Sequence, residues 1–382
     1  MKKLLLTTLA LTAAVSSFAF DFGGAAGNLS KFQKSGEEDF KINQKNFASL
    51  WTRIPFGETS AYFAAQGRFQ FEYDGLSETT VNAADLDYAH LYFSAGNFEF
   101  KFGRFARSDL SGIVYNQAGD GAEVSYAVPS FNASAWAAYT GLLNSQLTTI
   151  NDPDYSADSE KIYDPCAKYI TGGAKVSFPS LFAEQTLSLE AVLAKRLEGV
   201  KYDRLFAELA LEGPLSFING LFYDLTGIIG VSSYDDGDPL LSYLAKTDIS
   251  FYPGVKDAKI ALSAVYASGT PDSADADTTA FLAFTSTTAV NSVQQDEFSS
   301  IFLPGISASI KPLKSLLVSA GSDLVFSTNE NKVKYAGFQY NAGADWQIVS
   351  DVYAGAALTQ YFDKDNSNNS RTAVSLKAVI LF

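Results

Sequence analysis

The residues of this chain that could do chemistry are charged side chains on one face of segments whose other face is apolar. In residues 61–73, Arg68 and Glu72 occupy alternate positions among Ala, Gly, Phe and Tyr. Such charges can hold water, ions and small polar solutes by hydrogen bonds and electrostatic attraction. The same alternation gives the other charged residues of the polar faces, namely Arg53, Glu123, Lys175, Glu190, Arg196, Glu208, Lys246, Asp248, Asp323, Asp345 and Lys377.

The composition excludes several other kinds of chemistry. The chain has a single histidine, His90, and a single cysteine, Cys166, which are too few for a cysteine-rich zinc site or a disulfide framework. The sequence arranges no serine or acidic partner around His90 for hydrolysis. The formal net charge of −14 argues against nucleic-acid binding, which needs a basic face for the phosphates. We therefore expect no enzymatic activity, no metal site and no cofactor.

The segments that carry these charges are predicted to be β-strands, because polar and apolar residues alternate with a period of two. Most run for ten residues or more, whereas strands of globular proteins have about five or six and tilted membrane strands roughly 9 to 11. A hydrophobic content of 47% beside a mean hydropathy of +0.02 fits strands with one lipid-facing and one water-facing side. The pattern favours an antiparallel transmembrane β-barrel over a soluble sandwich. The phase is ambiguous over residues 85–93 and shifts at Arg104 and Phe105, which indicates a bulge.

The connections between these strands alternate between short ones and long or strongly polar ones. Transmembrane barrels show this asymmetry, with short periplasmic turns and longer extracellular loops. A first strand over residues 20–33 and a polar loop over residues 34–45 would put both termini on the periplasmic side and give 18 strands, with 16 as the alternative. The other long connections are residues 75–84, 107–120, 142–168, 198–202, 235–239, 268–299, 328–331 and 363–370.

Both ends of the chain carry targeting features. Residues 1–19 begin with Lys2 and Lys3, continue with an apolar run and close on a small-x-small pattern at Ala19, which is typical of a cleaved signal peptide. Residues 20–382 are predicted to form one barrel domain. Residues 372–382 alternate up to the terminal residue, Phe382.

Together, the signal peptide, the alternating loops and the last strand ending in Phe382 resemble Gram-negative-type outer-membrane porins. The resemblance implies an outer-membrane location, contact with membrane lipid, and recognition of the C-terminal strand by the barrel-assembly machinery. It also implies that the third long loop, residues 107–120, narrows the pore, with Arg104, Arg107, Asp109 and Asp120 as its charges. A homotrimer is a further analogy with this family.

We expect a passive diffusion channel for small hydrophilic solutes and ions, with a weak preference for cations because two long loops are acidic. The alternative is a surface protein whose barrel is only an anchor, its pore occluded by inward side chains or by residues 142–168. A transporter of hydrophobic substrates is disfavoured, because the predicted inner faces are polar. The acidic loop residues are Asp152, Asp154, Asp158, Glu160 and Asp164, then Asp272, Asp275, Asp277, Asp296 and Glu297.

Overall fold

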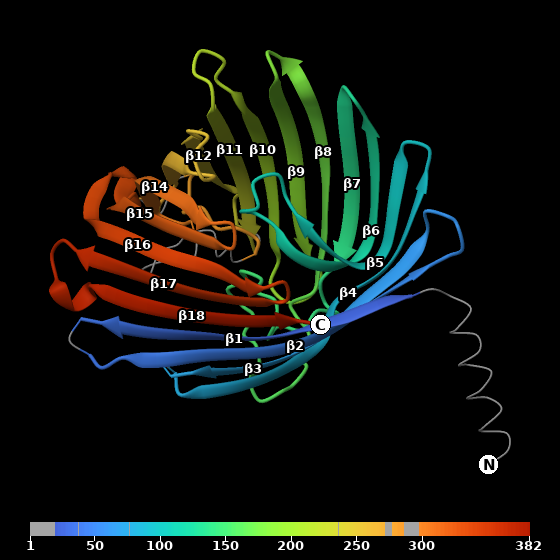
Figure 1. The fold of residues 1–382 in the computed structure, drawn as a ribbon, viewed down its shortest axis with the longest axis horizontal. Helices are drawn as coiled ribbons and strands as arrows, with labels where there is room; N and C mark the ends of the chain where they lie inside the picture. Colours follow the sequence, from blue (N-terminus) through green and yellow to red (C-terminus); the bar gives the residue numbers. More distant parts are fainter. Residues whose placement is uncertain (1–19, 37, 76, 236, 272–276, 286–297) are drawn as a thin grey trace.

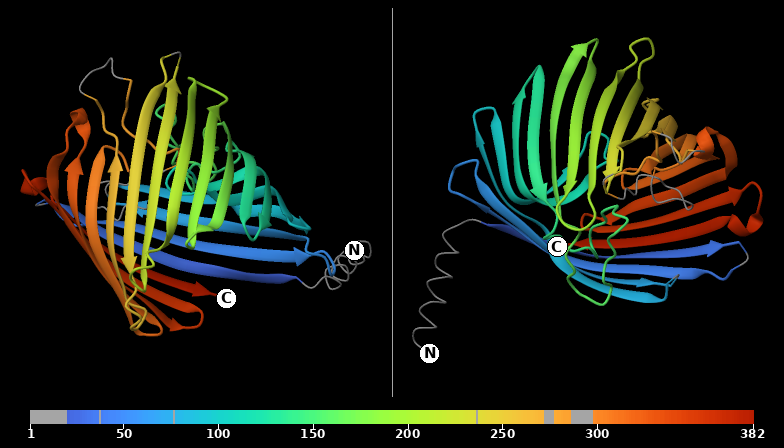
Figure 2. Two further views of the ribbon diagram at one scale, coloured as in Figure 1. Left: turned by 90° about the horizontal axis from the view of Figure 1, so that it is seen from above. Right: turned by 180° about the vertical axis from the view of Figure 1, so that it is seen from behind.

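The period-two segments form eighteen antiparallel strands that close into a barrel (Figures 1 and 2). This computed structural model describes residues 20–36, 38–75, 77–235, 237–271, 277–285 and 298–382. The predicted signal peptide lies outside the described residues. The strands are β1 (Asp21–Ser35), β2 (Lys41–Pro55), β3 (Tyr62–Asp74), β4 (Thr79–Ala95), β5 (Phe98–Ser108), β6 (Asn116–Val128), β7 (Phe131–Tyr139), β8 (Tyr169–Phe182), β9 (Gln185–Arg196), β10 (Tyr202–Pro214), β11 (Leu221–Tyr234), β12 (Leu240–Phe251), β13 (Lys259–Ala267), β14 (Ile301–Leu313), β15 (Leu316–Ser327), β16 (Lys334–Val349), β17 (Val352–Asp363) and β18 (Arg371–Leu381).

Closure of the barrel depends on the first strand, because β1 pairs with both β2 and β18. Every strand therefore has a neighbour on each side, which removes the unpaired edges that an open sheet presents. The strands have between 9 residues, in β7, and 17 residues, in β4. The predicted fold and the count of 18 strands are confirmed.

The two ends of the barrel differ as predicted. At the end that we call the turn end, residues 96–97 and 129–130 are two-residue connections. At the opposite end, the loop end, three connections matter for the site: L3 (residues 109–115), L4 (residues 140–168) and L7 (residues 268–300). The helical segments of the described chain are two 3₁₀ turns, η1 (Asn329–Asn331) and η2 (Ser367–Asn369), and no described helix could span a membrane.

Three predicted loops are shorter than expected. The loop expected over residues 34–45 covers only residues 36–40, the one expected over residues 75–84 covers only residues 75–78, and the one expected over residues 107–120 covers only residues 109–115. The ladder between β2 and β3 continues through these polar residues, and Lys45 Nζ lies 3.6 Å from Glu72 Oε2 across it. Strands that run past the apolar belt are polar on both faces, so the alternation ends before the strand does.

The ambiguous phase of residues 85–93 has a local cause. The register between β3 and β4 shifts between Gln66 and Gly67, which leaves Asp87 as an extra residue in β4. This bulge moves Asp87 to the polar face, where its carboxylate accepts hydrogen bonds from Gln66 Nε2 at 2.6 Å and Arg68 Nε at 3.1 Å. The shift expected at Arg104 has a different origin.

The ladder between β4 and β5 stops at the pair of Ala89 and Arg104. Gly103 precedes this point with φ +115°, and a Cβ there would lie 2.3 Å from the carbonyl oxygen of Ala89. The first ten residues of β4 therefore have no strand partner on the β5 side. We call this gap between the first half of β4 and β5 the seam. L4 fills it, because the Ala84 N–H donates to the Ile162 carbonyl at 3.3 Å and Asn144 Nδ2 donates to the Ala84 carbonyl at 3.2 Å.

The outer surface carries the apolar half of the alternation. Leu50 is 66% exposed and Phe69 is 49% exposed, on the face opposite to the polar side chains of the same strands. A belt of exposed leucine, isoleucine and phenylalanine side chains is unfavourable in water and favourable against lipid tails. The outer surface thus fits a membrane, and the polar side chains face the lumen.

Candidate functional site

Three loops from the loop end meet inside the barrel. The N–H groups of Phe284 and Thr285, in L7, donate to the carbonyl oxygen of Val114, in L3, at 3.0 and 3.1 Å. The N–H of Asn151, in L4, donates to the carbonyl oxygen of Phe284 at 2.9 Å. L7 is thereby held between L3 and L4, and the three loops together narrow the lumen.

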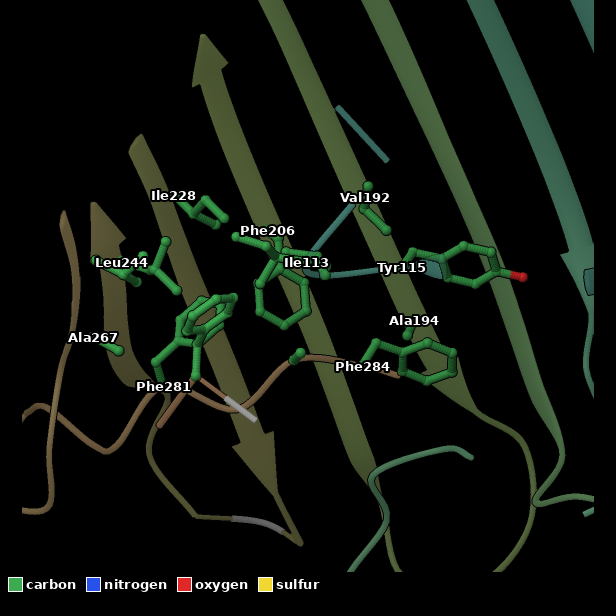
Figure 3. Close-up of a cluster of buried hydrophobic side chains, with 14 of the residues drawn as sticks. Ile113, Tyr115, Val192, Ala194, Phe206, Ile228, Leu244, Ala267, Phe281 and Phe284 are labelled. Carbon is green, nitrogen blue, oxygen red and sulfur yellow. The ribbon is translucent and has the colours of Figure 1, made fainter. Parts of the chain in front are cut away.

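An apolar cluster fixes these loops to one side of the barrel (Figure 3). Ile113 and Tyr115 of L3 and Phe281 and Phe284 of L7 are fully buried. They cover inward side chains of β7 to β13, which we call the packed wall: Trp136, Ala138, Val192, Ala194, Phe206, Ile228, Leu244, Val265 and Ala267. The expectation of polar inner faces is therefore wrong at the loop end of these strands.

Tyr115 is the central aromatic side chain of this cluster. Its ring centroid lies 4.7 Å from that of Trp136 and 5.8 Å from that of Phe284. Burial raises the pKa of Tyr115 to about 12, so its phenol stays neutral at ordinary pH. A neutral phenol allows the ring to remain in the apolar contact.

Below the apolar cluster lies a group of charges that we call the charged belt: Lys101, Arg107, Asp109, Glu123, Glu190 and Glu208. Arg107 joins three strands, because its Nη1 lies 3.0 Å from Glu123 Oε1 and its Nη2 lies 3.1 Å from Glu190 Oε1. Lys101 Nζ lies 3.5 Å from the other Glu123 oxygen. The structure thus brings together three of the predicted lumen residues, Glu123, Glu190 and Glu208, with Arg107 and Asp109 of the predicted constriction loop.

L3 is tied to the charged belt through Ser111. Its N–H lies 3.0 Å from Asp109 Oδ2 and 3.0 Å from Glu208 Oε2. Asp109 Oδ1 also accepts the N–H of Tyr115 at 2.7 Å. The side chain of Asp109 therefore organises the turn of L3, and Glu208 receives the loop on β10. The prediction that the third loop reaches into the pore agrees with this geometry.

Arg104 and Asp120 are placed differently from the prediction, since they lie in the seam and not at the tip of the constriction loop. Arg104 Nε donates to Asp120 Oδ1 at 2.9 Å, and its Nη1 donates to the Asp85 carboxylate at 2.5 Å and to the Leu86 carbonyl at 3.1 Å. Its Nη2 donates to Asp120 and to the carbonyl of Leu142, in L4. The guanidinium thus replaces the missing β4–β5 ladder and has a structural role.

Arg196 also serves a loop. Its Nε lies 3.2 Å from Asp152 Oδ2 and its Nη1 lies 3.0 Å from Asp154 Oδ2, both in L4. Tyr169 donates its hydroxyl to the same Asp152 oxygen at 2.8 Å. Arg196 was predicted to line the pore, whereas here it fastens L4 over the loop end of the barrel.

The remaining predicted lumen residues lie along the inner wall in smaller groups. Arg68 Nη2 lies 2.7 Å from Asp87 Oδ1, Lys246 Nζ lies 3.1 Å from Asp248 Oδ2, and Arg53 lies 4.0 Å from the centroid of the Tyr62 ring. The other residues placed on inward faces are Glu72, which pairs with Lys45, Lys175 opposite Glu190, Asp323 beside Gln339, and Asp345 and Lys377 in shared cavities.

Cavities follow the wall that the loops leave uncovered. We call this side, formed by β14 to β18 with β1 to β3, the bare wall. Cavities of about 340 and 270 Å³ lie against it, and both are lined by Asp345 and Lys377. A larger one of about 820 Å³ lies toward the turn end of β10 to β13, beneath the apolar cluster, and is lined by Glu212, Asp224, Lys246 and Asp248 among others.

The predicted set of lumen residues left out Lys101 of the charged belt and Arg204, although the alternation places Arg204 on the polar face. Arg204 is buried, and its Nη1 donates to the carbonyl oxygen of Ala283, in L7, at 3.2 Å. The guanidinium carbon lies 4.5 Å from the Tyr202 ring centroid and 4.7 Å from that of Phe284, and among the described residues Nε and Nη2 have no hydrogen-bond partner. Arg204 shares its face of β10 with Glu208, so the alternation that selected Glu208 applies to it as well.

The acidic residues of L4 are mostly neutralised. Lys161 Nζ lies 3.0 Å from Asp158 Oδ2 and 3.2 Å from Asp164 Oδ1. The N–H of Asp158, which donates to Asp164, is the main cause that lowers the pKa of that carboxyl, and Lys161 adds to it. Most of the acidic residues named in L7 lie outside the described residues, the exception being Asp277.

Metal chemistry finds no support among the described residues, since no group of three or more histidine, cysteine or acidic side chains there could hold an ion. Cys166 is buried in L4 without a disulfide partner. Burial raises the pKa of its thiol to about 12, which makes it unreactive.

The C-terminal strand ends against the first strand. The N–H of Gly24 donates to the carbonyl oxygen of Phe382 at 2.7 Å, and the N–H of Phe382 donates back to Gly24 at 3.0 Å. Phe382 is 69% exposed. The last residue is therefore fixed in the ladder while its ring stays accessible to a partner.

Comparison with solved structures places this barrel among known folds. The porin OccK2 (OpdF) of Pseudomonas aeruginosa has a TM-score of 0.66 at 13% identity, with 95% of this chain and 97% of that chain covered. OpdK of the same organism, solved with vanillate, has a TM-score of 0.61 at 13% identity, with 95% and 98% covered. A BenF-like porin from Pseudomonas fluorescens has a TM-score of 0.63 at 11% identity, with 95% and 98% covered.

No protein-family model matches the chain, and no curated protein matches its sequence. The structural similarity nevertheless extends over nearly the whole described barrel. The chain therefore has the fold of an 18-stranded outer-membrane porin, as the sequence predicted.

Proposed function

We propose that the protein is an outer-membrane channel through which small hydrophilic solutes and ions diffuse between the loops and the bare wall. The observation that carries this proposal is the asymmetry of the lumen. L3, L4 and L7 fill one side, whereas polar and charged residues line cavities along the other. The porin fold and the apolar outer belt support the same function.

We also propose a weak preference for cations. The acidic residues of L4 that carried this expectation are largely paired, so the preference must come from the lumen wall. Glu212, Asp224 and Asp248 face one another across β10, β11 and β12 at the same level, with Lys246 as the paired cation. A row of like charges on adjacent strands attracts mobile counter-ions.

Planar-bilayer recording of the purified protein tests both parts. We expect discrete, ohmic conductance steps and a reversal potential in a salt gradient that shows a modest excess of cation permeability. Asp224→Asn should reduce that excess without abolishing conductance, while Asp39→Asn, at the outer mouth, serves as the matched control. Silence of correctly folded protein would overturn the channel function, and an anion preference would overturn only the selectivity.

Organic solutes are included in this proposal. OccK2 has been solved with glucuronate and OpdK with vanillate, so porins of this fold bind small organic molecules. Liposome-swelling assays with an organic cation and an organic anion of similar size would rank them for this chain. If neither solute enters the liposomes, the proposal is restricted to inorganic ions.

The barrel-anchored surface protein remains a second candidate, because the apolar cluster occludes part of the bore. Its distinguishing feature would be a complete block by L3, L4 and L7. Deletion of residues 110–114 separates the two candidates: a channel conducts before and after the deletion, whereas an anchor with a plugged bore conducts only afterwards.

We propose further that residues 1–19 are removed on export and that the accessible ring of Phe382 serves recognition by the barrel-assembly machinery. N-terminal sequencing of the membrane-inserted protein tests the first point. Phe382→Ala should lower the amount of folded protein in the outer membrane more than it lowers the stability of the purified barrel. The homotrimer stays a prediction, which cross-linking in native membranes would test.

A further inference from the structure

Two carboxyl groups of the charged belt lie unusually close. Asp109 and Glu208 converge on the single N–H of Ser111, whose nitrogen lies 3.0 Å from Asp109 Oδ2 and 3.0 Å from Glu208 Oε2. Their residues are only 5% and 2% exposed. Two buried carboxylates in contact repel each other strongly, so such a pair holds one shared proton.

The hydrogen bonds indicate which group carries the proton. Both oxygens of Asp109 accept hydrogen bonds, from the Tyr115 N–H, the Ser111 N–H and the Ser111 hydroxyl. Glu208 Oε1 has no partner, and its Oε2 accepts only the Ser111 N–H among the described contacts. Because donors stabilise the ionised form, Asp109 is the carboxylate and Glu208 is the acid that donates to it.

The charges around the pair fit this assignment. They come from five strands, and on inward-facing positions they are His90 on β4, Lys101 and Arg107 on β5, Glu123 on β6, Lys175 on β8 and Glu190 on β9. With His90 neutral, three cations face four carboxyl groups. The set is therefore neutral when Glu208 is protonated and carries one excess negative charge when it is not.

The pair also controls the position of L3. The Ser111 N–H joins L3 to β10, and the Val114 carbonyl of L3 accepts from the N–H groups of Phe284 and Thr285. Release of L3 from β10 would move Val114 away from these two residues. L3 would then enter the passage along the bare wall.

We propose that Asp109 and Glu208 form a proton-operated latch that holds L3 on the packed wall and keeps the passage open. Loss of the Glu208 proton places two carboxylates in contact, repels L3 from β10 and obstructs the lumen. Since one proton leaves with each closure, the ratio of open to closed channels falls by at most about tenfold per pH unit above the transition.

This latch rests on the proposed channel function and is tested first by bilayer recording of the full-length protein from acidic to alkaline buffer. The wild type should close or flicker at alkaline pH. Glu208→Gln, which keeps a neutral donor, should stay open throughout. Glu212→Gln, on the same face of β10, and His90→Gln should both retain the alkaline closure. A wild type without pH response, a Glu208→Gln variant that still closes, or loss of closure in His90→Gln would each overturn the latch.

A second readout does not depend on conduction. In a Trp51→Phe/Trp346→Phe background, Trp136 is the only tryptophan, and its ring lies beside Tyr115 of L3. Release of L3 should expose Trp136 and shift its emission to longer wavelength at alkaline pH, but not in the Glu208→Gln variant. Heat-modifiable gel migration checks that each variant is folded.

The two readouts separate the possible failures. A pH-dependent emission shift in a protein that never conducts would overturn the channel and keep the latch. Steady conductance with unchanged Trp136 emission would overturn the latch and keep the channel.

Discussion

The packed wall and the bare wall are built from strands of the same alternation, yet they differ in what their inward side chains contact. On β7 to β13 the inward residues near the loop end are Trp136, Val192, Phe206, Ile228 and Leu244, which are covered by L3 and L7. On β15 to β18 the corresponding inward positions are Ser319, Asn341, Thr359 and Ser375, which line a cavity.

The difference shows that one side of a barrel can hold the loops in place while the other side leaves a passage for solutes. Apolar inward residues bury the loops by the hydrophobic effect, and this fixes the size of the aperture. Small polar inward residues line an open cavity instead. Changes on the packed wall should therefore alter the aperture, whereas changes on the bare wall should alter the passage itself.

The largest effect is expected from removing what the packed wall supports. Replacement of residues 110–114 by a short glycine linker deletes Ile113 and Val114 from the apolar cluster and frees L7. Single-channel conductance should rise severalfold, because the L3 residues that occupy the lumen are gone. Unchanged conductance would show that L3 does not limit the passage. A glycine linker in the turn at residues 215–220 is the control for loop replacement.

The next largest effect concerns the seam between β4 and β5, which belongs to neither wall. Arg104→Ala leaves the partly buried carboxylates of Asp85 and Asp120 without their cation, which should cost up to about 3–5 kcal/mol of stability. Thermal unfolding followed by heat-modifiable migration would measure it. Arg53→Ala, on a cation that only covers the Tyr62 ring, should cost much less. Equal losses in both variants would contradict the structural role of Arg104.

A bulky side chain on the bare wall should narrow the passage without loosening the loops. Ala357 lies in the cavity between Ser319 and Ser375, so Ala357→Trp should lower conductance by a clear fraction. Leu376 on the adjacent strand is 46% exposed on the outer face and does not line this cavity, so Leu376→Trp should leave conductance unchanged. Equal conductance of the two variants would place the passage elsewhere in the lumen.

The smallest effect is a pH dependence of L4 at the rim. The pKa of Asp164 is lowered by the Asp158 N–H and by Lys161. The ionised Asp164 carboxylate therefore stabilises the folded conformation of L4 fully above the ordinary carboxyl pKa. This stabilisation is lost as the pH falls through the lowered pKa of Asp164. Limited proteolysis of L4 should speed up in acid, and Lys161→Ala should move that change to higher pH. A protease pattern that is independent of pH would argue against this contribution.

The sequence was sufficient for the strands and insufficient for the loop contacts. Period-two alternation predicted 18 strands because each strand has a lipid face and a water face, and it assigned Glu123, Glu190 and Glu208 to the lumen. The meeting of Ser111 with Glu208 joins residues far apart in the chain, and no local pattern contains it.

Two errors have a common physical source. Arg104 was assigned to the constriction, and Val192 and Phe206 belong to faces that were expected to be polar. An alternating pattern gives the side of the strand on which a residue lies but not the partner it meets there. The partners of Arg104 are the seam residues and L4, and those of Phe206 are apolar side chains of L3 and L7, which the alternation of β10 does not contain.

The seam between β4 and β5 also bears on the order of assembly. A hairpin can normally complete its hydrogen bonds as soon as its two strands exist, but the first half of β4 cannot. Its Ala84 carbonyl bonds to Asn144, 60 residues later in the chain, and its Ala84 N–H bonds to Ile162. This part of the wall is therefore completed only after β5, β6 and β7 have formed and L4 has folded back across it. Closure at β1 and β18 is one late step in the formation of this barrel, and the docking of L4 on β4 is a second.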